Sequence, residues 1–248
     1  MLSRVVHRFA WVPLVLAAAI LFYAARSLPE MGDPDAPAST HVSPRYIEKA
    51  YEETGASNMV TAVLADYRGY DTLGETVVIL TAGLACLLVL GSFRRRDDVT
   101  AAGGAMAYAF GSDILDVTSR LLFPFIVLFA VYVLVHGHTS PGGGFQGGAI
   151  CAATIIAIRL VRGRASGLQL ETKSTAALAC LGILIYAGTG FVSLLYGRSF
   201  LDYGGLPLPL EGGHLRELGS LSVEIGVFIA VTAVLVLIFD VLTMGSES

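Results

Sequence analysis

The stretch His136-Gly-His-Thr-Ser-Pro-Gly-Gly-Gly-Phe-Gln-Gly-Gly148 lies between two apolar runs, residues 121–135 and 149–161. Proline fixes φ and lacks the amide hydrogen that a helix interior needs, while glycine permits positive φ and close approach of another backbone. The stretch therefore predicts a tight polar corner between two membrane-spanning helices. Its turn would be formed by Pro141, Gly142, Gly143, Gly144 and Phe145.

Three glycines of this stretch also fit the G-x-G-x-x-G pattern of dinucleotide-binding loops. That pattern needs a preceding strand and an acidic residue about twenty positions further on. Neither is present, so the dinucleotide interpretation is not favoured.

The composition is that of an integral membrane protein. Of the 248 residues, 54% are hydrophobic and only 15% are charged, whereas soluble domains carry about 25% charged residues. With a net charge of −4, the chain shows no basic surface for nucleic acid. We expect Cys86, Cys151 and Cys180 to be buried apolar side chains, because they are far apart and lie within apolar runs.

Six apolar runs approach the length of about 20 residues that a helix needs to cross a bilayer. They are residues 5–25, 75–90 with a short extension, 121–135, 145–160, 176–195 and 221–242. The sequence thus predicts an all-α integral membrane protein with about six transmembrane helices. Basic residues before the first run also fit a signal peptide, but the length of the run favours an uncleaved anchor.

The distribution of lysine and arginine predicts the orientation, since short cytoplasmic loops carry the excess of these residues. With the N-terminus inside, ten of the 16 fall on the cytoplasmic side. Both termini are therefore predicted to be cytoplasmic. The corner and the polar segment 27–74 would then face the outside.

The polar segment 27–74 begins as a proline-rich and acidic loop. Further on, apolar side chains recur at helical spacing and predict one or two amphipathic helices on the bilayer surface or on a partner. Residues 58–67 could alternatively dip into the membrane. A weakly apolar segment, 99–110, and a short helix at 112–116 would lead into the third span.

Carboxylates at or within the spans are candidates for ion transport, because charges are costly in the bilayer. Glu75 opens the second run, where Thr72-x-x-Glu75 is also a capping box, so a structural role and a transport role are both open. Glu224 lies in the sixth run, about one turn or 5 Å from its outer end, from where it could also reach water.

The histidines His136 and His138 could pass protons, because imidazole titrates near pH 6.5. A structural hydrogen bond is the alternative for one of them. Two positions apart, they do not face each other on a helix, and the stretch has no carboxylate to complete a metal site. We expect no metal, no cofactor and no catalysis by this chain alone.

Charged residues near the inner ends of the spans have simpler explanations. Asp113, Asp116 and Arg120 share one helix face, which predicts a solvated or salt-bridged surface. Asp240 lies near the inner end of the sixth run, where a half-exposed carboxylate needs no special role.

Two stretches resemble parts of a known family. Asn58-Met-Val-Thr-Ala-Val-Leu-Ala-Asp-Tyr-Arg-Gly-Tyr-Asp-Thr-Leu-Gly-Glu75 resembles the C-terminal part of the large A-type component (MrpA) of Mrp-type multisubunit Na⁺/H⁺ antiporters, and the small MbhE component of membrane-bound hydrogenases. The corner, with its flanking spans and Glu224-Ile-Gly-Val-Phe, resembles the B-type component of the antiporters (MrpB, MnhB) and its F-type hydrogenase counterpart. The boundaries suggested are an MbhE-like region at 1–95, with two transmembrane helices and an external loop, and an MrpB-like four-helix domain at 96–248.

The resemblance implies a non-redox subunit in the Na⁺/H⁺ path of an Mrp-type cation/proton antiporter of the cell membrane. Its partners would be large A-type and D-type subunits and small C-, E-, F- and G-type subunits. Glu75 matches the family's acidic residue of ion translocation, and the two parts are ordinarily on separate polypeptides. Alternatives are the ion-translocating arm of a hydrogenase-like or sulfur-reducing complex, and a purely structural scaffold.

The residues themselves agree with a subordinate role in such a complex. Small residues recur at 101–107 and 147–153, which allows helices to pack closely against partners. The chain has no sign of a broken helix with a buried lysine. It would therefore line or close a path whose main pump lies in another subunit.

Overall fold

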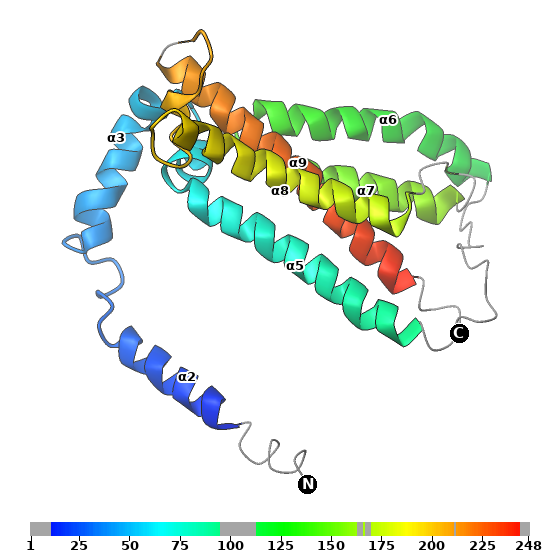
Figure 1. Ribbon diagram of the computed structural model, residues 1–248, viewed down its shortest axis with the longest axis horizontal. Helices are drawn as coiled ribbons and strands as arrows, with labels where there is room; N and C mark the ends of the chain where they lie inside the picture. Colours follow the sequence, from blue (N-terminus) through cyan, green and yellow to red (C-terminus); the bar gives the residue numbers. More distant parts are fainter. Residues whose placement is uncertain (1–10, 95–112, 163–165, 167–169, 211, 244–248) are drawn as a thin grey trace. The chain divides into compact units, whose positions relative to one another are not determined.

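The computed structural model describes residues 11–94, 113–162, 166, 170–210 and 212–243. Throughout these residues the regular elements are helices (Figure 1). The main ones are α2 (Trp11–Ala25), α3 (Ser43–Thr54), α4 (Met59–Thr61), α5 (Gly69–Arg94), α6 (Asp113–His136), α7 (Gly144–Arg162), α8 (Thr172–Leu195) and α9 (Gly213–Thr243). A π-helical segment, η2 (Ala62–Tyr67), joins α4 to α5, and a short 3-10 turn, η4 (Tyr203–Gly205), follows α8.

The chain divides into two units, residues 1–47 and 48–248. The first unit contains α2, an apolar helix of 15 residues with every side chain exposed. Residues 5–10 of the first expected span lie outside the described residues. Helix α3 begins in the first unit and ends in the second.

The second unit contains five helices that are long and apolar enough to cross a membrane, α5 to α9. The predicted all-α membrane class is therefore confirmed. Helix α9 lies at the centre of this unit, packed against α5, α7 and α8, while α6 packs mainly against α7 (Figure 1). Half of the apolar stretch of α9 is buried, compared with 11% of that of α5 and 17% of that of α6.

Glycines let the helices approach α9 closely. A Cβ added at Gly226 of α9 would lie 2.6 Å from the carbonyl oxygen of Gly182 in α8, and one added at Gly182 would overlap the Gly226 carbonyl. The two backbones therefore touch where the helices cross. Van der Waals contact between small residues is a main source of helix association in membranes.

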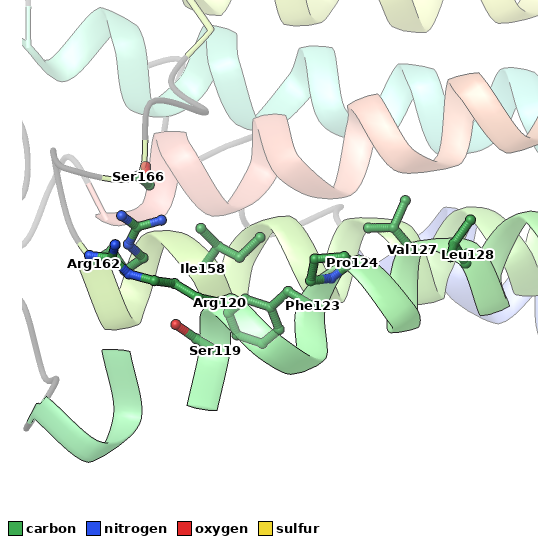
Figure 2. A pocket seen from close by; sticks show the side chains of 9 residues that line it. All are labelled: Ser119, Arg120, Phe123, Pro124, Val127, Leu128, Ile158, Arg162 and Ser166. Atoms are coloured by element: carbon green, nitrogen blue, oxygen red, sulfur yellow. The ribbon is translucent and has the colours of Figure 1, made fainter. Parts of the chain in front are cut away.

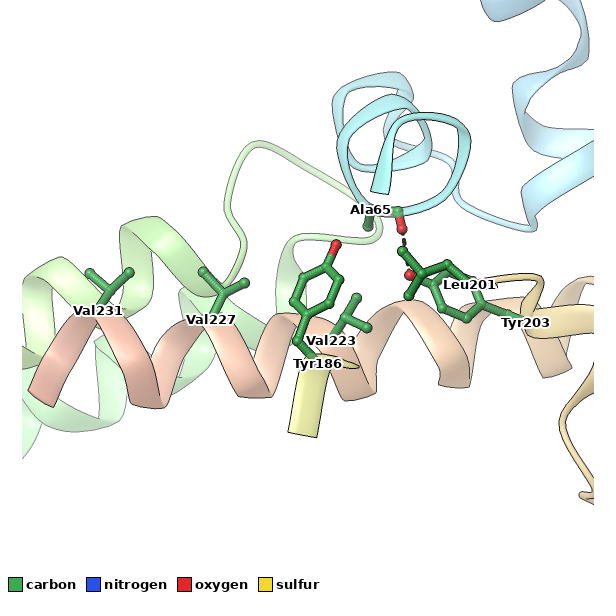
Figure 3. Packing of buried hydrophobic residues seen from close by; sticks show 7 residues of the cluster. All are labelled: Ala65, Tyr186, Leu201, Tyr203, Val223, Val227 and Val231. Atoms are coloured by element: carbon green, nitrogen blue, oxygen red, sulfur yellow. Dashed lines mark hydrogen bonds between the residues drawn. The ribbon is translucent and has the colours of Figure 1, made fainter. Parts of the chain in front are cut away.

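Two buried tyrosines fix the start of α5 against this centre (Figure 3). The Tyr186 hydroxyl of α8 donates to the carbonyl of Gly69 at 2.8 Å, and the Tyr203 hydroxyl donates to the carbonyl of Ala65 at 2.7 Å. Both rings are fully buried, among residues that include Val223. Phenol hydroxyls thus satisfy backbone carbonyls in a region where water has no access.

Helices α5 and α9 begin well before the spans that the sequence predicted. Helix α5 starts at Gly69 instead of Glu75, so the expected capping box is wrong: Thr72 lies inside the helix and donates to the carbonyl of Leu64 at 2.7 Å. Helix α9 starts at Gly213, eight residues before the expected span. Glu224 is therefore eleven residues into α9, about 16 Å along the axis at 1.5 Å per residue, and not one turn from its end.

The polar segment 27–74 contains an amphipathic helix, α3, as predicted, followed by the shorter helical segments α4 and η2. The helix expected at 112–116 is continuous with α6, which is described from Asp113, whereas residues 99–110 lie outside the described residues. The cysteines are less buried than predicted: Cys86 and Cys151 are half-buried and Cys180 is exposed.

Candidate functional site

The glycine-rich corner turns the chain between the end of α6 at His136 and the start of α7 at Gly144. Gly143 adopts a φ of +121°, which side chains rarely tolerate, and its amide donates back to the carbonyl of Val133 at 3.0 Å. A Cβ at Gly137 would lie 2.8 Å from the Gly143 nitrogen. The turn is thus compact because glycine occupies both sides of its closest approach.

Side chains from the segment before α5 bind this corner. The Asn58 side-chain amide donates to the carbonyls of Gly137 at 2.9 Å and Ser140 at 2.8 Å, and its backbone amide donates to the carbonyl of His138 at 3.0 Å. The Thr61 hydroxyl donates to the same Gly137 carbonyl at 2.6 Å. The two stretches that carry the family resemblance therefore contact each other directly.

Glu224 of α9 reaches the first turn of α7. Its Oε2 accepts a hydrogen bond from the Gly144 amide, and a Cβ added at Gly143 would lie 2.9 Å from the same oxygen. Free amides and the helix dipole make a helix N-terminus a favourable place for an anion. The half-buried carboxylate therefore sits where its negative charge is stabilised by α7.

The next glycines of the stretch bring α7 against its neighbours. A Cβ at Gly147 would lie 2.7 Å from the carbonyl oxygen of Ala130 in α6, and one at Gly148 would lie 2.9 Å from the carbonyl oxygen of Phe228 in α9. Thr232 of α9 also donates to the Gly148 carbonyl at 3.0 Å. The glycine run thus positions Glu224 by holding α7 on α9.

Glu75 lies in the second turn of α5 and is exposed. Within the described residues its carboxylate makes no ion pair or hydrogen bond. The side chain therefore faces outward from the second unit, and no hydrogen bond or ion pair in the described part of the chain joins Glu75 to Glu224.

The two histidines of the corner have different surroundings. The His136 ring stacks on Tyr132 with centroids 4.8 Å apart, and its Nδ1 lies 3.0 Å from the Thr139 hydroxyl. His138 is only 5% exposed, and neither of its ring nitrogens has a hydrogen-bond partner among the described residues. Burial lowers the pKa of His138, and the negative charge of Glu217 partly opposes this shift.

Sequence reasoning missed a charged cluster at the start of α9. Arg216 of α9 donates to both oxygens of Asp66, at 2.9 and 2.6 Å, and to Asp202 at 2.9 Å. The Asp66 side chain is 4% exposed, and burial raises its pKa while the guanidinium opposes the rise. The available signal was an arginine close to a strongly apolar run, which usually has a buried partner.

A second buried pair joins α7 to α9 near their other ends. Arg159 and Asp240 form an ion pair with side chains only 6% and 12% exposed. The expectation that Asp240 is half-exposed without a special role is therefore wrong. Arg159 lies in the last turn of α7, and from the sequence it had served only to predict the orientation in the membrane.

The face of α6 with Asp113, Asp116 and Arg120 forms ion pairs, as predicted. Asp116 pairs with Arg120 at 2.8 Å and with Arg162 of α7 at 3.0 Å. These arginines lie at one end of an apolar groove of about 600 Å³ between α6 and α7, lined further along by Phe123 and Pro124 (Figure 2). Asp116 neutralises part of their charge.

Two protein-family models match parts of the chain. Residues 114–237 match the model described as a domain related to the MnhB subunit of the Na⁺/H⁺ antiporter. The chain belongs to this MnhB-related family. Residues 18–105 match a second model, MbhE of the MBH complex, so the MnhB-related part is preceded by an MbhE-like stretch.

Known relatives carry both stretches. The chain is 30% identical over 210 residues to the A/B-type component of a probable K⁺/H⁺ antiporter of Rhizobium meliloti, covering 73% of this chain but only 21% of that relative. One chain of the Mrp complex from Dietzia sp. DQ12-45-1b matches with 31% identity and a TM-score of 0.66 over 99% of this chain and 26% of its own.

A chain of the archaeal membrane-bound sulfane sulfur reductase matches with 30% identity and a TM-score of 0.64, over 98% of both chains. Both structures therefore contain the MbhE-like and MnhB-related parts on one polypeptide. The joining of the two parts, which the resemblance had presented as unusual, is shared with these relatives.

Proposed function

We propose that the chain is a non-redox membrane subunit of an Mrp-type cation/proton antiporter and contributes to its Na⁺/H⁺ path and its assembly. The observation that carries the proposal is Glu224 of α9, a half-buried carboxylate hydrogen-bonded to the first amide of α7. Membership of the MnhB-related family supports it. Glu75, His136 and His138 are proposed as further groups of the path, and the complex is proposed to supply the large pumping subunits.

The surroundings of Glu224 suit a group that exchanges a proton for a cation. The N-terminus of α7 stabilises the carboxylate anion, whereas burial among apolar helices stabilises the neutral acid. Because the two influences oppose each other, we propose that Glu224 changes between its neutral and its charged form during transport. A cation that approached would tip the balance toward the anion and release the proton.

The test is cation/proton exchange in inverted vesicles that contain the whole complex, with Glu224→Gln and Glu75→Gln. We expect Na⁺-driven proton movement to be lost in each variant, while the amount of complex purified through a tagged sister subunit stays normal. Glu171→Gln, at an exposed position before α8, is the matched control and should leave exchange unchanged. Normal exchange by an assembled Glu224→Gln complex would remove that residue from the path.

The likeness to a component of a K⁺/H⁺ antiporter makes the cation part of the same experiment. Pulses of Na⁺ and K⁺ in parallel give the preference of the complex. A reporter fused after Gly142 tests the proposed orientation, in which this corner faces outside and both termini are cytoplasmic.

A second candidate is the ion-translocating arm of a redox-driven complex. It is favoured by the match to the sulfane sulfur reductase chain, which covers 98% of both chains. Purification of the intact complex separates the two candidates: antiporter-like membrane subunits alone support the first, and co-purifying soluble subunits with metal clusters support the second. A purely structural subunit would tolerate both carboxylate substitutions but lose assembly when the corner glycines are enlarged.

A further inference from the structure

A polar cavity of about 440 Å³ lies next to the corner and is separate from the contact between Glu224 and Gly144. It is lined by the end of α3, the loop after it, the corner and the first turn of α9. Its ionisable side chains, besides the phenol of Tyr51, are Glu52, His138, His214 and Glu217. The cavity is therefore acidic when both imidazoles are neutral.

His138 is a buried residue in the wall of this cavity. Its carbonyl accepts a hydrogen bond from the backbone amide of Asn58 at 3.0 Å, and only 5% of the residue is exposed. A neutral imidazole has one donor and one acceptor, yet neither ring nitrogen has a partner in the described part of the chain. Buried polar groups are almost always hydrogen-bonded, and a polar cavity of this size holds several waters.

The groups that face His138 favour the uptake of positive charge. Glu217 of α9 acts on the ring electrostatically and lies 3.6 Å from the exposed His214. On α3, Glu52 pairs with Lys49 at 3.2 Å, which leaves Glu217 as the main negative group. The described residues contain no group of three or more His, Cys, Asp or Glu placed to hold a metal ion, so a proton fits the cavity better than a metal does.

We propose that this cavity is a water-filled proton vestibule, in which His138 binds a proton delivered by water and Glu217 balances the resulting charge. In the step itself, hydronium gives its proton to the free ring nitrogen, an N–H bond forms, and water remains. The vestibule would supply protons to the path of the proposed function, on which this last point rests. Access from solution is provided by the exposed rim at His214.

The vestibule is tested on the purified complex by deuterium exchange of the histidine C2–H as a function of pH, read by mass spectrometry with fragments that separate His138 from His136. We expect His138 to exchange, which requires water at the ring, with a midpoint below the ordinary histidine value of about 6.5. Glu217→Gln should lower the His138 midpoint further, by about half a pH unit for the loss of one neighbouring negative charge in a wet site. Absence of deuterium exchange at His138, or a midpoint that is the same with and without Glu217→Gln, would overturn the vestibule.

Two controls keep the inference distinct from the proposed function. His214→Gln should move the His138 midpoint less than Glu217→Gln does. A midpoint that shifts in NaCl but not in choline chloride would identify a sodium site and overturn the proton assignment. The deuterium measurement needs no transport, so it can succeed where the proposed function fails. If His138 titrates but cation/proton transport survives His138→Gln, the vestibule is retained and only its place in the ion path is rejected.

Discussion

At the scale of single residues, Gly144 and Glu224 contact each other through both backbone and side chain. The carboxylate accepts the Gly144 amide, and a Cβ added at Gly144 would overlap the carbonyl oxygen of Glu224 while lying 3.0 Å from Oε2. Backbone and side chain of one residue on α9 thus both face this glycine. The position serves packing and charge stabilisation together.

Gly144→Ala is therefore expected to separate α7 from α9 locally and to destabilise the complex by about 1–3 kcal/mol, the usual cost of overpacking. Thermal unfolding of the detergent-purified complex measures the effect. Gly74→Ala in α5 is the matched control, because a Cβ there meets nothing within 4 Å. Equal melting temperatures for the two variants would contradict the contact.

Which residues are special was partly readable from the sequence. Glu224 and the glycines stood out because charge within an apolar run and repeated glycine are both rare. Asp240 did not stand out, because its partner Arg159 is 81 positions away and nothing local distinguishes a paired carboxylate from an exposed one. The difference between His136 and His138 was likewise hidden, since it depends on Tyr132 stacking on one side and on a cavity wall on the other.

At the scale of elements, the crossing of α8 and α9 at Gly182 and Gly226 sets how tightly the bundle packs. We expect Gly182→Ala to destabilise the complex markedly, because the added methyl would overlap the Gly226 carbonyl and lie 2.6 Å from the Ala230 nitrogen. Gly188→Ala, on the same helix but with no neighbour within 4 Å, should be neutral or stabilising by up to about 1 kcal/mol through helix propensity. Recovery of assembled complex and its melting temperature report both outcomes.

The cluster of Asp66, Arg216 and Asp202 ties η2 and the loop before η4 to the start of α9. Arg216→Met would leave Asp66 buried without its partner, at a cost of about 3–5 kcal/mol. The double variant Asp66→Asn/Arg216→Met should cost clearly less than the sum of the single variants. A double-mutant cycle on denaturant unfolding measures this coupling, and strictly additive effects would show that the pair contributes no interaction energy.

The same cluster explains why helix starts were mispredicted. Polar and glycine residues before Glu75 and before residue 221 read as loop, because local sequence contains no partner for them. In the fold, Tyr186 binds the Gly69 carbonyl across 117 positions and Arg216 binds Asp66 across 150. Tertiary hydrogen bonds thus extend both helices, whereas the spans between them followed from apolar length alone.

At the scale of the whole molecule, the outer helices are built to be covered. The apolar stretches of α5 and α6 are only 11% and 17% buried, and large apolar side chains of α6 such as Phe125, Leu128 and Phe129 are exposed. Apolar surface of this extent is stable only against lipid or other subunits. Glu75, on the exposed side of α5, is correspondingly placed for contact with a partner rather than with this chain.

The proposed division at residues 95 and 96 can be tested by expressing the two parts as separate chains with the sister subunits. We expect them to co-purify, because Asn58 and Asp66 of the first part bind the corner and Arg216 of the second. The double variant Asn58→Ala/Asp66→Asn should reduce the recovered pair several-fold, with Ser57→Ala as the control. Equal recovery of the unchanged pair, the double variant and the control would show that these polar contacts do not join the parts.

The hydrogen bonds of Asn58 to the corner join segments that are synthesised at different times. The asparagine is translated 79 residues before the carbonyl of Gly137 that it binds, so at about 5–20 residues per second it waits roughly 4–16 seconds for its acceptor. When the hairpin of α6 and α7 leaves the ribosome, Asn58 and Thr61 have already been synthesised. The corner therefore never has to wait for its donors, whereas Asp66 of the same segment waits until Arg216 has been added.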